Sequence, residues 1–205
     1  MRGAIIAAGG PSRRMGRPKA LLPVLGVPLV LRVVEAVAQV VQEIVIASKA
    51  PESAMIRSLV PPEIRVVDDE RGEQSPLVAL ITGARAISAR DVAYLGCDHP
   101  LLAPKILEAL FEAGGEYDAA IPRWPDGRIE PMVAVYGRER TLAAAIDAVD
   151  SRRFANTDMI SRLPRVRYVP TEDLRRYDPH LDSFVNVNSP ADVAEAEQRL
   201  RPRST

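Results

Sequence analysis

The stretch from Ala7 to Leu22 carries the residues best suited to handle a phosphorylated ligand. It reads AAGGPSRRMGRPKALL, with two adjacent glycines followed by three arginines and one lysine. Adjacent glycines allow a ligand to approach the backbone closely. The stretch matches neither Gly-x4-Gly-Lys-Ser/Thr nor Gly-x-Gly-x-x-Gly, so it is not one of the common phosphate-loop motifs. The glycines and the basic residues together predict a phosphate-binding site, and a basic surface loop is the alternative interpretation.

Asp98 is the strongest single candidate for a metal ligand. It follows the apolar run from Val92 to Leu95, which is typical of a buried strand and would hold the carboxylate on a rigid scaffold. A single carboxylate suits Mg²⁺, which also binds substrate phosphates and keeps several waters. A turn-forming aspartate before Pro100 is the alternative.

Lys19 could place a point charge against phosphate oxygens, and a solvated lysine is the alternative interpretation. Paired with a carboxylate and its metal, such a lysine indicates phosphoryl or nucleotidyl transfer, in which positioning and charge neutralisation supply most of the acceleration. No side chain has to attack, because a phosphate of the second substrate can be the nucleophile.

Other polar residues also follow expected strands. Asp68 directly follows the third expected strand, and an ordinary acidic loop, formed with its acidic neighbours, is the alternative. Asn186 and Asn188 lie in the last expected strand. Because ligands bind beyond the carboxyl ends of parallel strands, we expect these side chains to converge with Lys19 and Asp98 on one cleft.

The remaining nucleophiles and metal ligands give little support to other chemistry. Cys97 precedes Asp98 and should point to the opposite face, into the core. His99 could donate a hydrogen bond at the site, but a turn role is favoured, and His180 is expected at the surface. With no cluster of histidines or cysteines, a zinc site is not supported. No Gly-x-Ser-x-Gly motif supports a hydrolase triad.

The elements that must position these residues alternate between short apolar runs and longer segments of helical period. This alternation predicts an α/β fold, with a three-layer α/β/α, Rossmann-like arrangement and a mostly parallel sheet. Strands are expected at 4–7, 43–48, 64–67, 92–96, 119–122, 132–136, 165–169 and 184–188. Helices are expected at 29–41, 53–60, 76–87, 105–113, 141–149, 158–163 and from Pro190, where Ser189 is the predicted cap.

Length and composition narrow the classes of function. At 205 residues, the chain can bury a proper core. Its 27 basic and 27 acidic residues cancel, so general attraction to nucleic acid or to a membrane surface is not expected. The single cysteine fits a reducing cytosol. No signal-peptide core is seen, and no apolar run approaches the roughly 20 residues of a membrane span, so we expect a soluble cytoplasmic protein.

Four motifs resemble, in order and spacing, those of the molybdenum cofactor nucleotidyltransferases. They are AAGGxSxRMGxxKxLL from Ala7, CDHP from Cys97, EPMVAVY from Glu130 and FVNVNSP from Phe184. The resemblance spans residues 4 to about 197, nearly the whole chain. It implies the family's nucleotidyltransferase fold, as a single domain over residues 1–200, and we expect 201–205 to form a disordered tail.

The resemblance is strongest to the guanylyltransferase branch (MobA type). That branch attaches GMP from GTP to the phosphate of molybdopterin and releases pyrophosphate, with Mg²⁺ as the implied cofactor. Gly9-Gly10, Glu130-Pro131 and the Asn-Val-Asn run at 186–188 are guanylyl-like, whereas Arg17-Pro18-Lys19 is closer to the cytidylyl branch, which uses CTP.

Roles carry over to the matching positions only as the resemblance implies them. Asp98 would hold the metal and act with Lys19 and Arg14 in catalysis. The residues implied to bind GTP are Ala8, Gly9, Gly10, Lys19, Asp68 and Asp98, and those implied to face molybdopterin are Asn186 and Asn188.

The implied partners are therefore GTP and molybdopterin, with transient contacts to molybdoenzymes or other cofactor-biosynthesis proteins, and without nucleic acid or membrane. The alternatives are a cytidylyl relative, another small-molecule nucleotidyltransferase such as a sugar-phosphate enzyme, or a non-catalytic nucleotide-binding protein. The roles of Arg13, Arg17 and His99 are left open.

Overall fold

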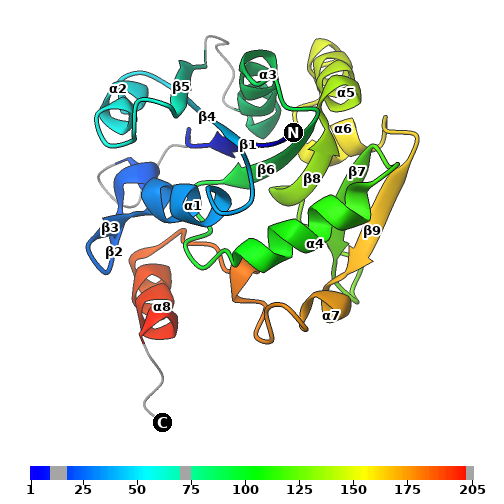
Figure 1. Cartoon of the computed structure of the whole chain (residues 1–205). Coiled ribbons are helices and arrows are strands. Elements are labelled where there is room, and N and C mark those ends of the chain that lie inside the picture. The colour runs from blue at the N-terminus through cyan, green and yellow to red at the C-terminus, as the bar shows by residue number, and fades with distance from the viewer. Residues whose placement is uncertain (10–17, 70–74, 202–205) are drawn as a thin grey trace.

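A computed structural model describes residues 1–9, 18–69 and 75–201 of the chain. The strands of its main sheet are β1 (Arg2–Ala7), β4 (Glu43–Ser48), β5 (Arg65–Asp68), β6 (Asp91–Gly96), β7 (Ala119–Arg123), β8 (Val133–Gly137) and β9 (Val166–Pro170). They lie in the order β5-β4-β1-β6-β8-β7-β9 (Figure 1). A small antiparallel pair, β2 (Pro23–Val24) and β3 (Val27–Pro28), stands apart from this sheet.

The sheet is mixed but mostly parallel, as the sequence predicts. Strands β5, β4, β1 and β6 run parallel to one another, and β9 runs parallel to β7. Only β8 is antiparallel to its neighbours, pairing with both β6 and β7. The carboxyl ends of β1, β4, β5 and β6 therefore lie at the same edge of the sheet as the amino end of β8. At this edge, Asp98 follows β6 and Glu130 precedes β8.

Helices cover both faces of the sheet. They are α1 (Leu29–Val37), α2 (Glu52–Arg57), α3 (Pro76–Ala86), α4 (Pro104–Gly114), α5 (Arg138–Asp150), α6 (Asn156–Ile160), α7 (Thr171–Leu174) and α8 (Pro190–Leu200), with 3-10 turns η1 (Lys19–Leu21) and η2 (Asp182–Phe184). Apolar residues of α1 and α4 form one core layer, and those of α3, α5 and α6 form the other. The chain thus has the expected three-layer α/β/α architecture.

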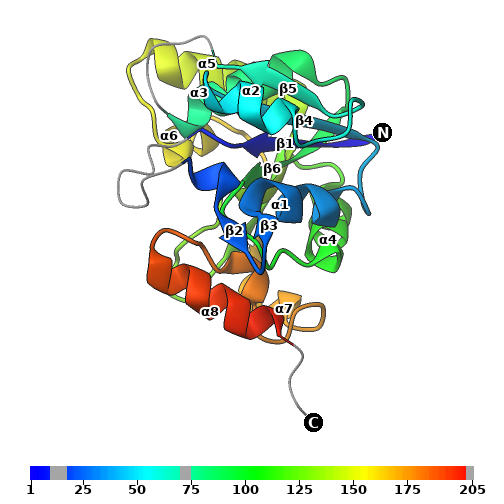
Figure 2. The ribbon, with the colours of Figure 1, turned by 90° about the vertical axis from the view of Figure 1, so that its left-hand side faces the viewer.

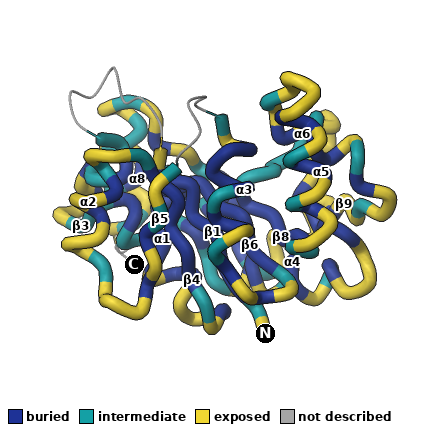
Figure 3. The backbone as a smooth tube through the Cα atoms, turned by 90° about the horizontal axis from the view of Figure 1, so that it is seen from above, coloured by how far each residue is buried: buried dark blue, intermediate teal, exposed yellow. Residues whose placement is uncertain are grey.

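Strand β1 shows how sequence alternation builds the two layers. Ala4 and Ile6 belong to the core layer under α1 and α4, whereas Ile5 and Ala7 belong to the layer under α3 and α5. A Cβ on Gly83 would lie 2.4 Å from Cγ2 of Ile5, so glycine lets α3 pack directly on the strand. Seen from above, the central strands β1, β4, β6 and β8 are buried, whereas the edge strand β9 is largely exposed (Figure 3).

Several expected elements differ in the structure. The helix expected at 53–60 ends at Arg57, and the helix expected at 158–163 spans Asn156–Ile160. The segment 184–188, predicted as a strand, pairs with no strand among the described residues. One backbone hydrogen bond joins it to the turn after β6, from the Val187 amide to the Asp98 carbonyl at 3.0 Å. Its alternating pattern arises because Phe184 and Val187 enter two different apolar clusters. Helix α1 ends at Val37 rather than at residue 41, because a turn follows it.

The final helix, α8, begins as predicted. The Ser189 hydroxyl accepts from the Asp192 amide, and the Asp192 carboxylate accepts from the Ser189 amide at 2.8 Å, which completes a capping box. Its Ala196 packs with Leu22 and Val24 in a small cluster beside the main core. Figure 2 shows α8 next to the β2–β3 pair. The expected tail falls mostly on 202–205, which lie outside the described residues. Among the described helices, none has the length and apolar character needed to cross a membrane.

Candidate active site

Lys19 lies at the centre of the candidate site. It opens the 3-10 turn η1 shortly after β1, and its ammonium donates to Asp98 Oδ2 at 2.6 Å and to Asn188 Oδ1 at 2.7 Å. The side chains of Lys19 and Asp98 are 20% and 21% exposed, so the ion pair is partly shielded but reachable from solvent. Three residues that the sequence predicts to converge are therefore in direct contact.

Asp98 is held by the end of β6. The Cys97 amide donates to the Ala7 carbonyl at 3.0 Å, and the Gly96 amide donates to the Met132 carbonyl at 3.2 Å, so the turn is anchored on two neighbouring strands. A Cβ on Gly96 would lie only 2.3 Å from Asp98 Oδ1. Glycine at position 96 is thus required for the observed position of the carboxylate.

The pKa values of the site explain its charge at neutral pH. Burial alone would raise the pKa of Asp98, but the charges of His99 and Lys19, together with the Lys19 hydrogen bond, hold it below its ordinary value. The pKa of His99 is lowered, chiefly by burial, against the opposing pull of Asp98 and Glu130. Burial thus disfavours the charged form of His99, and Lys19 is the cation in hydrogen-bond contact with the Asp98 carboxylate.

Asn188 is positioned by the start of α8. Its backbone amide donates to the Asp192 carboxylate at 2.7 Å, in the same capping arrangement that begins the helix. One residue earlier, the Val187 amide donates to the Asp98 carbonyl. The amide of Asn188 therefore faces Lys19 because its segment is tied both to the helix cap and to the Asp98 backbone.

The other predicted nucleotide-side residues are spread more widely. Ala8 is buried and donates to the Ala47 carbonyl at 2.8 Å. Gly9 is exposed, and a Cβ there would lie 3.9 Å from the Lys49 nitrogen, an ordinary contact, so the described protein packing does not itself require a glycine. Gly10 and Arg14, as well as Arg13 and Arg17, lie outside the described residues.

Asp68 is not part of the Lys19 group. Its carboxylate accepts from the Ser53 hydroxyl and from Arg57 at 3.5 Å, both on α2. Asn186 is exposed and, among the described residues, takes no part in the contacts that join Lys19, Asp98 and Asn188. The roles predicted for Asp68 and Asn186 stay predictions.

The structure also identifies residues that the sequence reasoning missed. His99, weighed as a turn residue, is 3% exposed, and its Nε2 lies 3.7 Å from Asp98 Oδ1. Glu130 lies close enough to raise the pKa of His99 by its charge. The motif from Glu130 was a usable signal, because it begins just before β8, whose amino end adjoins β6. Cys97 is buried as predicted, and burial raises the pKa of its thiol.

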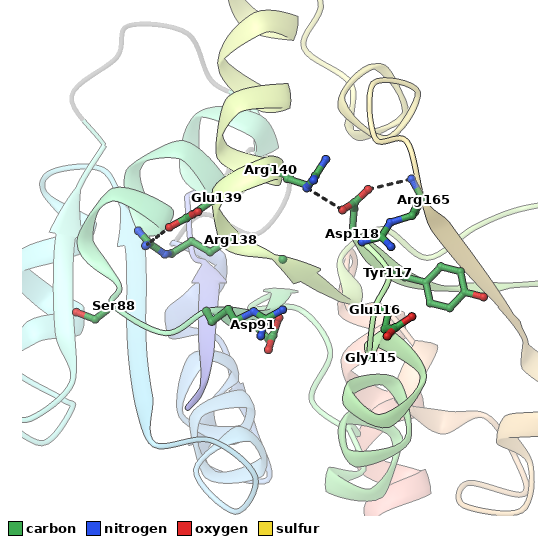
Figure 4. A pocket seen from close by; sticks show the side chains of 12 residues that line it. Ser88, Asp91, Gly115, Glu116, Tyr117, Asp118, Arg138, Glu139, Arg140 and Arg165 are labelled. Carbon is green, nitrogen blue, oxygen red and sulfur yellow. Dashed lines mark hydrogen bonds and ion pairs between the residues drawn. The ribbon is translucent and has the colours of Figure 1, made fainter.

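A large cavity lies at the opposite edge of the sheet (Figure 4). It measures about 710 Å³ and is lined by four arginines and four acidic residues, so its charges cancel. Asp118, 3% exposed, already accepts from Arg140 at 3.2 Å and from the Arg165 amide at 2.9 Å. The charges that line the cavity therefore give it no net attraction for a phosphate.

The three-layer architecture and the sheet order are those of the α/β nucleotidyltransferase fold. Residues 4–166 match the MobA-like NTP transferase domain, and the chain belongs to that family. A probable molybdenum cofactor guanylyltransferase of Natronomonas pharaonis is 33% identical over 205 residues, which cover 97% of this chain and 98% of the relative. A protein of the same description from Methanosarcina mazei is 30% identical over 94% of this chain and 88% of its own.

Solved structures agree with this family. Molybdopterin-guanine dinucleotide biosynthesis protein A from Archaeoglobus fulgidus superimposes with a TM-score of 0.82 at 25% identity, covering 97% of this chain and 98% of its own. A 4-diphosphocytidyl-2C-methyl-D-erythritol synthase from Anaerococcus prevotii superimposes with a TM-score of 0.73 at 15% identity, covering 97% of this chain and 95% of its own. The second likeness shows the fold alone.

Proposed function

We propose that this protein is a molybdenum cofactor guanylyltransferase, which transfers GMP from GTP to the phosphate of molybdopterin and releases pyrophosphate. The observation that carries the proposal is the contact of one lysine ammonium with both Asp98, at 2.6 Å, and Asn188, at 2.7 Å. A mobile point charge between a metal-binding carboxylate and an amide is suited to phosphate groups arriving from two substrates. The guanylyltransferase descriptions of the near full-length relatives support guanine as the base.

The reaction needs positioning more than it needs a protein nucleophile. An oxygen of the molybdopterin phosphate forms a bond to the α-phosphorus of GTP. The bond from that phosphorus to the oxygen bridging to the β-phosphate breaks, and its electron pair leaves on pyrophosphate. The attacking phosphate is already ionised, so no general base is required. Lys19 would turn from Asp98 to the phosphate oxygens and stabilise their charge.

Asp98 fits the role of a magnesium ligand. Its lowered pKa keeps the carboxylate ionised, and its side chain is reachable from solvent. The part of the chain that the structure describes holds no group of three or more acidic, histidine or cysteine ligands. This suits Mg²⁺, which needs one or two carboxylates when phosphates and waters complete its shell. Bound there, the ion would neutralise charge on the triphosphate.

The remaining roles follow the family resemblance. We assign Ala8, Gly9, Gly10 and Asp68 to GTP, Arg14 to catalysis with Lys19 and Asp98, and Asn186 with Asn188 to molybdopterin. The reaction would take place in the cytoplasm, and the product would pass to molybdoenzymes or to other cofactor-biosynthesis proteins by transient contact.

A nucleotide panel tests the proposal. Purified protein with molybdopterin and Mg²⁺ should release pyrophosphate with GTP, and Asp98→Asn should abolish this release while the protein stays folded. Release with CTP alone would assign the chain to a cytidylyl activity. A tightly bound nucleotide that is never turned over would instead indicate a non-catalytic binding protein.

A further inference from the structure

The hairpin between β7 and β8 carries a tryptophan that joins several parts of the molecule. The indole Nε1 of Trp124 donates to Glu130 Oε1 at 2.6 Å, and the guanidinium of Arg128 lies 5.2 Å from the centre of the Trp124 ring. The ring also packs edge-on against Phe184, with centroids 5.8 Å apart and planes at 72°. Trp124 is therefore held by the hairpin on one side and contacts the 184–188 segment on the other.

The 184–188 segment leads directly to the candidate active site. Phe184, which is 8% exposed, begins it, and Asn188, whose amide oxygen accepts from Lys19, ends it. Between them, the Val187 amide donates to the Asp98 carbonyl at 3.0 Å. At its far end the segment is fixed by this bond and by the Asn188 amide, which donates to the Asp192 carboxylate at 2.7 Å. At its start, Phe184 packs in the apolar core and contacts the Trp124 ring edge-on, so a shift of Phe184 would be passed along the segment to Asn188.

Glu130 lies at the end of the same hairpin, beside the strand that leads to Asp98. The Glu130 amide donates to the Pro122 carbonyl at 3.0 Å, and the Val133 amide donates to the Glu130 carbonyl at 3.2 Å. Val133 pairs with Leu95 of β6. The residue that accepts from the Trp124 indole is therefore held by the backbone of the sheet.

We propose that Trp124, oriented by its hydrogen bond to Glu130, is a positioning residue that sets the Asn188 amide against Lys19. The expected effect of Trp124 on substrates rests on the proposed function, in which Asn188 binds molybdopterin, the acceptor of GMP. Trp124 touches neither Lys19 nor Asp98 in any described contact, so its effect must pass through the 184–188 segment. It should accordingly act on the acceptor and leave GTP largely unaffected.

The variants test the orientation of the Trp124 ring separately from the presence of an aromatic ring at this position. Trp124→Phe keeps an aromatic ring against Phe184 but removes the indole N–H. Glu130→Ala removes the acceptor, whereas Glu130→Gln keeps an acceptor oxygen and should restore near wild-type behaviour. Asp126→Ala is the matched control, because Asp126 lies in the same hairpin and pairs only with Arg128, at 2.9 Å, in the described contacts.

The first measurement is steady-state kinetics with each substrate varied in turn. Trp124→Phe and Glu130→Ala should lower kcat/KM for molybdopterin about tenfold and change KM for GTP less than about twofold. In an Asn188→Ala background, Trp124→Phe should have less than about a twofold further effect, because residues that act through one another are not additive. Fully additive losses, or equal losses for both substrates, would overturn the proposal.

The second measurement needs no substrate, so it remains valid if the proposed function fails. An amine-reactive ester is applied to the full protein, and acylation of Lys19 is followed by peptide mass spectrometry against the exposed Lys105 of the same sample. Trp124→Phe and Asn188→Ala should each raise the relative rate for Lys19 about threefold at an unchanged Tm, and Asp126→Ala should not. An unchanged rate of Lys19 acylation in Trp124→Phe would refute the positioning role. If Lys19 is acylated more slowly in wild type than in Trp124→Phe but the wild-type protein does not turn over GTP, only the proposed function is refuted.

Discussion

Replacement of Lys19 by methionine should separate the catalytic charge from the fold. Methionine keeps an unbranched apolar chain but loses the ammonium that binds Asp98 and Asn188. In catalysis, the loss of one positioned donor to developing phosphate charge costs roughly 2.7–4 kcal/mol, so kcat/KM should fall about 10²–10³-fold. The same change leaves the Asp98 carboxylate without its cation.

The structural cost of Lys19→Met should be much smaller than its catalytic cost. Hydrogen bonds to charged groups contribute about 1.5–3 kcal/mol, and solvent reduces this at a site where both partners are about a fifth exposed, so we expect a loss of about 1–2 kcal/mol. A domain with a stability of about 5–15 kcal/mol stays folded after such a loss. The lost activity would then be a catalytic effect.

The assay pairs pyrophosphate release with urea unfolding. Lys105→Met, the same substitution at an exposed lysine at the start of α4, is the control and should change neither quantity. A Lys19→Met variant with kcat/KM within about threefold of wild type would refute the role of Lys19 in phosphate binding. A loss of activity matched by global unfolding would refute the separation of catalysis from stability.

Three further predictions concern the groups around Lys19. Gly96→Ala should lower kcat at least about tenfold with a folded protein by circular dichroism, because its Cβ would lie 2.3 Å from Asp98 Oδ1; unchanged kinetics would show that the carboxylate can shift freely. The difference in free energy of unfolding between wild type and Lys19→Met should be full above the ordinary Asp98 pKa of 3.8 and should narrow as pH falls through the lower folded pKa, because the protonated carboxyl no longer needs the cation. Urea unfolding at a series of pH values measures this difference, and a constant difference would contradict the prediction. Asp192→Ala removes acceptors for the Asn188 and Ser189 amides and should lower the free energy of unfolding by about 0.5–2 kcal/mol, and an unchanged urea midpoint would show that the cap contributes nothing.

Much of the fold was predictable because the signals are local. Apolar runs at β4 and β6 and the Ser189-Pro190 start of α8 each carry their own pattern, and the structure places these elements as predicted. The segment 184–188 shows where this reasoning fails. Its alternation of apolar and polar residues is the same as that of a strand, but Phe184 and Val187 enter separate clusters, and only tertiary contacts reveal this.

The candidate site divides in the same way. Lys19 and Asp98 could be proposed from residue type and position at strand ends, and the structure joins them with Asn188. His99 was a candidate for a hydrogen bond at the site, but its burial could not be predicted from its position in the chain. The contact of Trp124 with Phe184 could not be predicted either, because it joins residues 60 positions apart and depends on which strands are neighbours. The antiparallel placement of β8 between β6 and β7 is what brings Glu130 to this edge, and no local pattern in the sequence specifies that order.

The central claim is tested most directly by following the α-phosphate of the nucleotide. Protein, molybdopterin and Mg²⁺ are incubated with GTP labelled at the α-phosphate, and in parallel with CTP labelled in the same way. Label from GTP should appear in a molybdopterin product whose mass corresponds to added GMP, and label from CTP should not. Label transferred from CTP and not from GTP, or label that never leaves the triphosphate, would contradict the guanylyltransferase assignment.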